Sequence, residues 1–162
     1  MRSLKSVKFG DSKNSLLHMY EIKNPLIVTF NFIVVQISKF VPFFSLKNFL
    51  LGLIGIKIGK DVAISPFVTF DFFFPELISI ADNSIIGFNS TILCHEFLIK
   101  ECRYGPVTIG KNVMLGANST VLPGISIGND ATISACSLIN KDVKANSFVG
   151  GVPAKQLRNN SQ

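Results

Sequence analysis

Aliphatic side chains recur at every sixth position from Ile58 onward, with two interruptions. Read in sixes, residues 58–144 fall into four groups of three, and the repeat breaks at residues 76–79 and 98–108. A period of six matches neither the 3.6-residue period of an amphipathic helix nor the two-residue alternation of a strand. The first position of each six is always Ile, Leu, Val or Phe, and the fifth is usually small or β-branched. Both positions are therefore expected to point into a narrow core.

The fourth position of the repeat is typical of a sharp corner. It holds Asp, Asn or Gly in eight of the twelve sixes, and these residues tolerate a positive φ. Three short strands and three corners in every eighteen residues predict a triangular coil. Coils of this kind stack through main-chain hydrogen bonds, so the fold class is an all-β solenoid, a parallel β-helix of about four coils. Twelve sixes in phase argue against a sandwich of unrelated strands.

The segment before the repeats is organised differently. Residues 1–20 are polar and basic and are expected to form an irregular arm, whereas residues 26–40 and 44–55 predict two apolar helices separated by Val41-Pro42. The longest charge-free stretch, residues 24–38, is shorter than the roughly 20 residues that a membrane-spanning helix needs. Residues 22–56 can cap the open end of the coil or lie in a membrane interface, and we favour capping.

Three regions follow from this pattern. They are a basic arm with an apolar helical cap (1–56), a β-helix with an excursion loop at 98–108 (57–151), and a C-terminal tail or short helix (152–162).

Charge and cysteine content narrow the possible partners. Residues 1–60 hold nine Lys or Arg against two acidic residues, while the rest of the chain is close to neutral. An anionic lipid or a phosphorylated substrate could use this charge, but no motif supports nucleic-acid binding. The three cysteines, Cys94, Cys102 and Cys136, lack metal-ligand spacing and are expected to be free thiols. With no secretory signal visible, we expect a cytoplasmic protein, with peripheral membrane contact as an open alternative.

The repeats resemble those of the left-handed parallel β-helix, hexapeptide-repeat acyltransferases. The similarity covers residues 57–158 and includes His95, Leu122-Pro123-Gly124, Lys141-Asp142-Val143 and Gly151-Val152-Pro153-Ala154-Lys155. Together these motifs are similar to those of maltose-, galactoside- and Nod-factor-type O-acetyltransferases. The resemblance implies a left-handed coil, a homotrimer with active sites between subunits, and acetyl-CoA as acyl donor with no metal required.

His95 is the candidate catalytic base. It occupies a fourth position, where other repeats place Asn, Asp or Gly, and it lies beside the long break in the repeat. Imidazole titrates near physiological pH and can therefore take a proton from a hydroxyl group. The resemblance implies that the activated hydroxyl attacks the thioester directly. Cys94 is a weaker candidate nucleophile, and His18 is expected to be structural or incidental.

Four residues are candidates for the acceptor site. Asp71 lies near the position of an acceptor-binding Asn in the galactoside-type enzymes, with a solvated turn aspartate as the equal alternative. Glu96 occupies a fifth position that otherwise favours small residues, so it could line the acceptor site or orient a neighbour, although it is not expected to buttress His95. Arg103 and Tyr104 belong to the excursion loop, where polar groups could bind acceptor hydroxyls.

Six residues match the family's coenzyme A contacts. The resemblance places Ala117 and Ala135 beside the pantetheine arm, Asn140 and Lys141 near its outer end, and Lys155 and Arg158 near the nucleotide phosphates. Lysine at 155 keeps the charge of the family's arginine but weakens bidentate phosphate contact.

The resulting hypothesis is a CoA-dependent O-acetyltransferase that acts on a sugar or glycan hydroxyl. An N-acyltransferase for an aminosugar and an inactive trimeric scaffold or membrane-associated adaptor remain alternatives. A zinc carbonic anhydrase on the same coil would need three histidines, and the chain has two. A nucleotidyltransferase is excluded because no glycine-rich nucleotide domain precedes the repeats.

Overall fold

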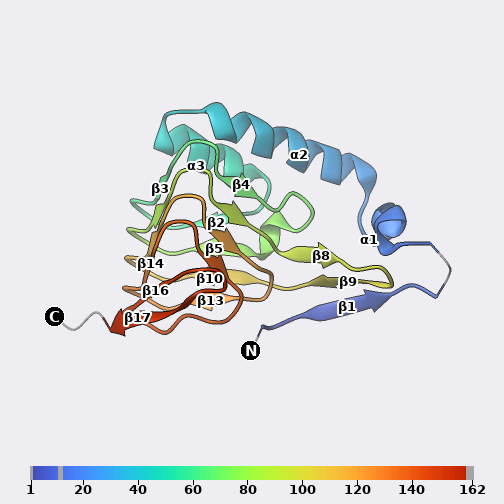
Figure 1. The fold of residues 1–162 in the computed structure, drawn as a ribbon. Coiled ribbons are helices and arrows are strands. Elements are labelled where there is room, and N and C mark those ends of the chain that lie inside the picture. Colours follow the sequence, from blue (N-terminus) through green and yellow to red (C-terminus); the bar gives the residue numbers. More distant parts are fainter. Residues whose placement is uncertain (1, 11–12, 160–162) are drawn as a thin grey trace.

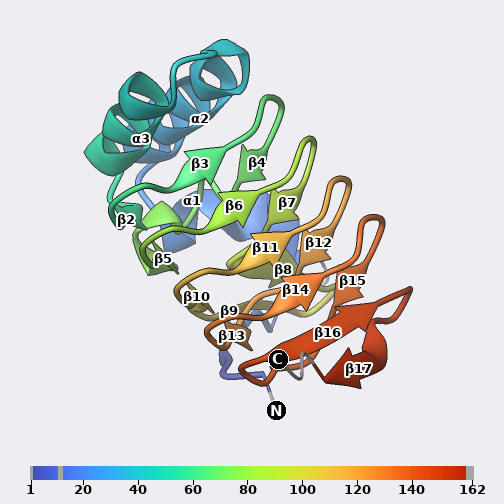
Figure 2. The same cartoon turned by 90° about the vertical axis from the view of Figure 1, so that its left-hand side faces the viewer.

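Three parallel sheets form the sides of a triangular coil (Figures 1 and 2). The computed structural model describes residues 2–10 and 13–159. The first sheet contains β2 (Lys57–Ile58), β5 (Ile78–Ile80), β10 (Val107–Ile109) and β13 (Ser126–Ile127). The second contains β3 (Ala63–Ile64), β6 (Ile85–Ile86), β11 (Met114–Leu115), β14 (Thr132–Ile133) and β16 (Ser147–Gly150), with β17 (Lys155–Asn159) at its edge. The third contains β4 (Thr69–Phe70), β7 (Thr91–Ile92), β12 (Thr120–Val121) and β15 (Leu138–Ile139). The stacked β-helix predicted from the period of six is confirmed.

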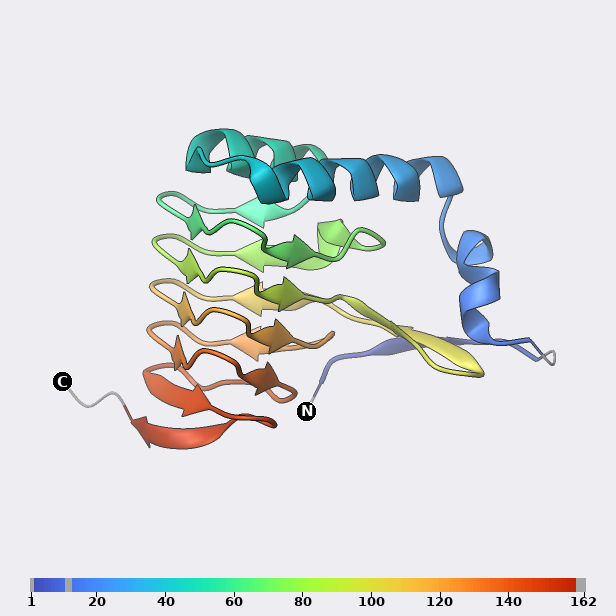
Figure 3. The ribbon, with the colours of Figure 1, turned by 45° about the horizontal axis from the view of Figure 1, so that its top comes forward.

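The two breaks in the repeat lengthen individual coils without disturbing the stack. Ala63, Ile85, Met114 and Thr132 stand in register, so successive coils contain 22, 29 and 18 residues. The first extra segment includes the 3-10 helix η2 (Pro75–Leu77). The second leaves the coil as a hairpin of β8 (His95–Phe97) and β9 (Glu101–Tyr104), which projects sideways in Figure 3. The predicted loop at 98–108 is therefore mostly strand.

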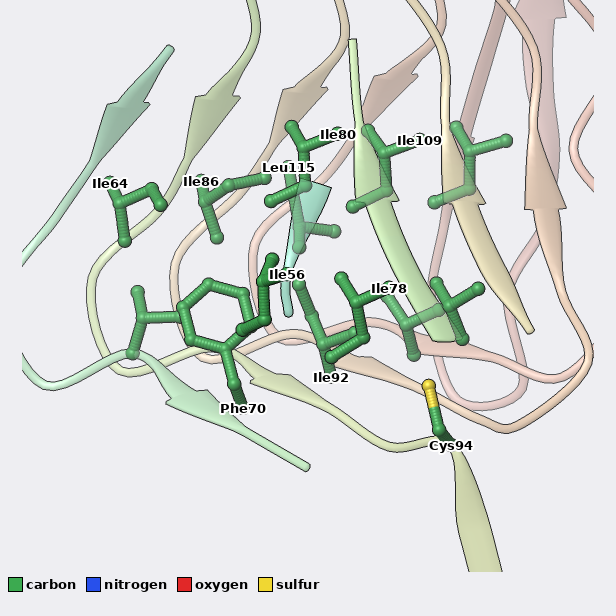
Figure 4. Close-up of a cluster of buried hydrophobic side chains, with 14 of the residues drawn as sticks. Ile56, Ile64, Phe70, Ile78, Ile80, Ile86, Ile92, Cys94, Ile109 and Leu115 are labelled. Atoms are coloured by element: carbon green, nitrogen blue, oxygen red, sulfur yellow. The ribbon is translucent and has the colours of Figure 1, made fainter. Parts of the chain in front are cut away.

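The core consists of aliphatic ladders along the axis of the coil. Ile64, Ile86, Ile92 and Leu115 are fully buried and lie in rows with other first-position residues (Figure 4). Fifth-position serines are buried too, and their hydroxyls donate to main-chain carbonyls, as Ser84 does to Gly110 at 2.8 Å and Ser90 to Gly116 at 3.0 Å. A small residue that satisfies its own polar group suits an interior this narrow.

The corners are left-handed turns, as the fourth-position residues predict. Asn89 and Asn118 have φ near +55°, and the amide of Asn89 donates to Asn118 at 2.9 Å on the next coil. Cys136 follows Asn118 at the same corner with φ +57° and does not extend this side-chain ladder. The left-handed conformation is unfavourable for cysteine, whereas Asn tolerates it well.

Replacing Cys136 with Asn is expected to raise the free energy of unfolding by about 0.5–1.5 kcal/mol. The oxygen of the new side chain would accept a hydrogen bond from the amide of Asn118, as the oxygen of Asn118 accepts one from the amide of Asn89. Urea denaturation with a constant m-value measures the change. Cys136→Ala serves as control because it keeps the unfavourable φ, and an Asn variant no more stable than the Ala variant would contradict the prediction.

Two N-terminal helices close one end of the coil. Helices α2 (Pro25–Phe40) and α3 (Phe44–Leu53) lie side by side across β2, β3 and β4, as Figure 3 shows. Lys47 of α3 is 1% exposed and donates to the carbonyls of Ile64 at 2.9 Å and Ser65 at 3.0 Å. Burial lowers the pKa of this lysine. The contact joins the cap to the first coil, so capping is the arrangement observed.

The outer face of the cap is apolar as well. Leu26, Phe30, Phe40, Phe43 and Phe49 are each at least half exposed. No helix in the described part of the chain has the length and hydropathy needed to span a bilayer.

Both ends of the chain differ from expectation. The N-terminal arm is ordered: β1 (Lys5–Lys8) pairs antiparallel with β9, and η1 (Ser15–His18) and α1 (Met19–Ile22) follow. The expected C-terminal helix is wrong, because Lys155–Asn159 forms β17, antiparallel to β16. An isolated helix this short would be marginal in water, whereas the free edge of β16 offers a full set of hydrogen bonds. Residues 160–162 lie outside the described part.

Candidate active site

His95 lies where the chain leaves the coil. It follows β7 at the corner after the third sheet and begins the hairpin of β8 and β9 (Figure 1). Strand β1 pairs with the other side of β9, so a three-stranded antiparallel sheet extends the site away from the coil. The first helical turns, η1 and α1, reach this region and lie beside the hairpin.

Asp71 holds the imidazole of His95 in place. Its Oδ2 lies 2.6 Å from Nδ1 of His95, and the carboxylate side chain is 0% exposed while the imidazole is 15% exposed. The same oxygen accepts from the backbone N–H groups of Cys94 at 2.6 Å and His95 at 3.0 Å. Oδ1 accepts from the N–H groups of Phe73 and Phe74, both at 2.8 Å. The carboxylate thus fixes the corner as well as the ring.

These contacts determine the charge of Asp71 and the tautomer of His95. Burial raises the pKa of Asp71, but the hydrogen bond and charge of His95 and the N–H groups of Phe74 and Cys94 outweigh it, so the pKa lies below its ordinary value. An ionised carboxylate only accepts, so Nδ1 of His95 carries the proton in the contact. Nε2 is then the basic nitrogen, and the arrangement can abstract a proton from a ligand.

The expectation for Asp71 needs correction. The residue is not a solvated turn aspartate, because it is 1% exposed. It does not suit contact with an acceptor either, since both oxygens are engaged within the protein. Asp71 instead contacts His95 and holds its ring in place. Its place one residue after β4 brings it under the next coil, which sequence spacing alone did not indicate.

Aromatic rings surround the imidazole. The ring centroids of Phe73 and Phe97 lie 5.0 and 5.3 Å from that of His95, and those of Phe74 and Phe72 lie 6.2 and 6.5 Å away. A cavity of about 300 Å³ opens at the ring. Its walls come from the N-terminal segment (Leu16, Met19, Tyr20, Val28, Thr29, Phe32) and from the corner and hairpin (Phe72, Phe73, His95, Phe97).

Glu96 and Arg103 lie away from this cavity. They face each other across the hairpin, one pair along from His95 and Tyr104, and neighbouring strand residues point to opposite faces. The two terminal guanidinium nitrogens of Arg2 donate to Glu96, at 2.5 and 3.1 Å, and Arg103 pairs with Glu101 at 2.5 Å. The structure therefore does not bring these two residues to the His95 ring. Through its contact with Arg2, Glu96 instead connects the N-terminal segment to the hairpin.

Tyr104 and His18 have other partners. Tyr104 stacks on Phe74 with centroids 4.8 Å apart, next to the aromatic cluster and outside the cavity wall. His18 stacks on Phe9 at 4.6 Å and contacts Glu21 at 2.7 Å.

The cysteines do not suit nucleophilic chemistry here. Cys94 is fully buried, and desolvation together with the charge of Asp71 raises its pKa. Desolvation and the charges of Asp71 and Glu96 raise the pKa of Cys102 to about 11. Both thiols therefore stay protonated at neutral pH. Within residues 2–10 and 13–159, no three His, Cys, Asp or Glu side chains are grouped to hold a metal ion.

The candidate donor residues fall into two places. Asn140, Lys141 and Lys155 line one hollow of about 180 Å³ at the C-terminal end of the coil. Ala117 and Ala135 occupy the corner between the second and third sheets, while His95 lies at the corner after the third sheet. The side chain of Arg158 lies outside the described part of the chain.

Comparison with known proteins assigns the family. The chain is 48% identical over 143 residues to "Putative acetyltransferase YvoF" of Bacillus subtilis, covering 88% of this chain and 83% of that one. The chain belongs to the hexapeptide-repeat acetyltransferase family. A family model described as the hexapeptide repeat of succinyl-transferase matches residues 106–141 of this acetyltransferase.

Solved structures agree on the fold. A hexapeptide-repeat acetyltransferase from Vibrio cholerae in complex with acetyl coenzyme A matches with a TM-score of 0.72 at 19% identity, over 91% of this chain and 99% of that one. A galactoside acetyltransferase in complex with coenzyme A matches with a TM-score of 0.62 at 21% identity, over 97% and 87% of the two chains.

The sequence of this acetyltransferase did not predict the N-terminal part of the site. Leu16, Met19 and Phe32 line the cavity at His95, yet they lie more than 60 residues away along the chain. Their apolar character was visible, but nothing local indicated that the arm pairs with β9 and returns to the hairpin. The aromatic run at Phe72 and Phe73 was the one available signal of an apolar wall.

Proposed function

We propose that the chain transfers an acetyl group from acetyl-CoA to a hydroxyl group of a sugar or glycan-type acceptor, with His95 as the general base. The observation that carries the proposal is the contact of His95 with the buried Asp71 at the wall of an open cavity. The family assignment supports acetyl transfer. The name of the galactoside acetyltransferase with the same fold supports a sugar hydroxyl as the first acceptor to test.

The reaction balances without a covalent enzyme intermediate. Nε2 of His95 takes the acceptor's proton as the acceptor oxygen attacks the thioester carbonyl carbon. Asp71 stabilises the imidazolium that forms and keeps the ring oriented. When the carbon–sulfur bond breaks, the proton passes from Nε2 to the departing thiolate, which yields an acetyl ester and CoA. A backbone N–H group would stabilise the oxyanion. Cys94 takes no part because its thiol is buried and protonated.

The chain's own residues fit coenzyme A at its anionic end. Three lysines line the same hollow, together with the amide of Asn140 and one carboxylate residue, Asp142. The lysines are Lys141, Lys144 and Lys155. This hollow belongs to the last coil, whereas His95 leaves the second, so they are two coils or about 10 Å apart along the axis. An extended pantetheine arm spans an axial separation of this size, whichever chain supplies the histidine. Arg158 remains a further candidate phosphate contact.

The position of Ala117 and Ala135 supports a site shared between chains. These alanines and His95 of one chain lie at different corners, with the third sheet between them. A donor that follows the alanines would meet a histidine more directly if a second chain supplied it. The exposed apolar side chains of Ile85 and Met114 on the second sheet are suited to burial between chains. We therefore propose a homotrimer of left-handed coils with sites between subunits.

Replacing Lys141 and Lys155 together with Ala is expected to weaken acetyl-CoA binding about tenfold or more, because two phosphate-facing charges are lost. Calorimetric titration of the purified protein measures the affinity, and one site per chain is expected. Lys57→Ala/Lys60→Ala is the matched control, since these exposed lysines lie on the first coil. Equal affinity in both double variants would contradict this placement of the donor. No binding up to millimolar acetyl-CoA would overturn the proposed function.

A further inference from the structure

The cavity at His95 has too few polar groups for a free sugar. Aromatic and aliphatic side chains form most of its wall, and the polar side chains other than His95 are Tyr20 and Thr29. A sugar ring carries several hydroxyl groups, and each loses water on entering a cavity and needs a partner there. Hydrocarbon needs no such partner and gains from burial. The lining therefore favours a ligand with one reacting polar group next to an apolar body.

The mouth of the cavity is apolar too. Leu16, Tyr20 and Phe32 all line it, and they are 52, 55 and 44% exposed. Phe32 is held on α2 by an edge-to-face contact with Phe72, at 5.4 Å between centroids. Exposed apolar side chains at the entrance of a site indicate a ligand that covers them.

The segment that carries Phe32 has no acidic residue from residue 22 to residue 60. A hydrocarbon chain that leaves the cavity between α1 and α2 therefore meets no carboxylate from this segment.

We propose that the acceptor is an amphiphile whose reacting hydroxyl is attached to a hydrocarbon chain, with the hydroxyl at His95 and the chain between α1 and α2. This inference rests on the proposed function, because it takes His95 as the base. It concerns the cavity lined by His95 and the N-terminal segment, and not the hollow lined by Lys141 and Lys155. The amphiphile could come from solution or from a bilayer.

The test compares 1-octanol, kept below its solubility limit, with methanol. The chain has two histidines, so the imidazole Cε1–H signal of His95 can be assigned by its loss in His95→Asn and followed during titration. Each methylene group buried contributes about a fourfold factor in Kd, so the octyl compound is expected to bind at least tenfold more tightly.

Two variants on α2 sharpen the comparison. Phe32→Ala should remove most of the preference for the octyl compound, whereas Phe30→Ala should keep it, since Phe30 is similarly exposed but does not line the cavity. 1-Octanol dissolved in phosphatidylcholine vesicles then distinguishes the sources: stronger His95 perturbation by the vesicles than by the free alcohol indicates a bilayer, and the reverse indicates a soluble amphiphile.

Equal affinities for the two alcohols, or no effect of either on His95, would overturn the inference, including the case in which a second copy of the chain fills the cavity. Acetyl-CoA titrations on the same samples separate this result from failure of the proposed function. Donor binding without an alkyl preference would contradict only the proposal of an amphiphilic acceptor. Octyl binding without donor binding would support the ligand class and sink acetyl transfer.

Discussion

Replacing His95 with Asn is expected to lower kcat for acetyl transfer by about 10²–10⁴-fold while acetyl-CoA affinity changes by less than about twofold. Asn is close to the imidazole in shape near the backbone, but it has no basic nitrogen to take the acceptor's proton. Release of free CoA thiol, with the best acceptor from a panel of sugars, aminosugars and alkyl glycosides, measures the rate.

His18→Asn is the matched control for this variant. His18 stacks on Phe9 and contacts Glu21, and it does not line the cavity at His95. Its replacement should leave kcat close to that of the wild type. A His95→Asn enzyme that retains more than about a tenth of the wild-type kcat would contradict the role of general base.

Replacing Asp71 with Asn is expected to lower kcat by about 10²–10³-fold and the free energy of unfolding by about 2–4 kcal/mol. The amide NH₂ is a donor, and in either orientation it would face backbone N–H groups that now donate to the carboxylate. These are the N–H groups of Phe73 and Phe74, or those of Cys94 and His95. The His95 ring would lose the acceptor of its Nδ1 proton in one orientation, and in the other a neutral amide oxygen would replace the charged carboxylate oxygen. Steady-state kinetics and urea denaturation measure the two effects.

The stability effect of this variant also depends on pH in a defined direction. The pKa of Asp71 lies below its ordinary value of 3.8, so its contribution is present above that value and is lost as pH falls from there through the folded pKa. The difference between wild type and Asp71→Asn should therefore shrink below about pH 4, where the carboxylate takes up a proton.

Asp82→Asn controls for loss of a carboxylate at a corner of the coil. Asp82 contacts Lys111 at 3.1 Å and the N–H group of Lys60 at 3.0 Å. It lies at the corner between the first and second sheets, whereas His95 follows the third sheet. It should keep kcat. An Asp71→Asn enzyme with unchanged kcat, or with a stability difference that grows as pH falls below about 4, would contradict the positioning role.

The coil was predictable because its physical requirements repeat. A buried residue at each first position and a left-handed corner at most fourth positions leave a signal in every six residues, so the repeat alone assigns Ile64 and Ile86 to the core and Asn118 to a corner. His95 stood out for the same reason, since it departs from the pattern at a corner.

The partners of His95 were harder to predict because they depend on contacts between coils and on the N-terminal arm. Asp71 and His95 are 24 residues apart, and they meet because the coil between them returns the chain to the same corner. The pairing of β1 with β9 spans almost 100 residues, and no local pattern encodes it. Strand β17 was unexpected for a similar reason. The hydrogen bonds offered by the open edge of β16 outweigh the weak helical preference of a short tail.

The most direct test of the account is the tautomer of His95, measured by ¹⁵N NMR of the two imidazoles in the wild type and in Asp71→Asn. The measurement needs no knowledge of the acceptor, and His95→Asn assigns the signals. We expect neutral His95 to carry its proton on Nδ1, with Nε2 unprotonated, and this preference to weaken in Asp71→Asn. A neutral His95 protonated on Nε2, with the same tautomer in both proteins, would contradict the claim that Asp71 holds His95 as the catalytic base.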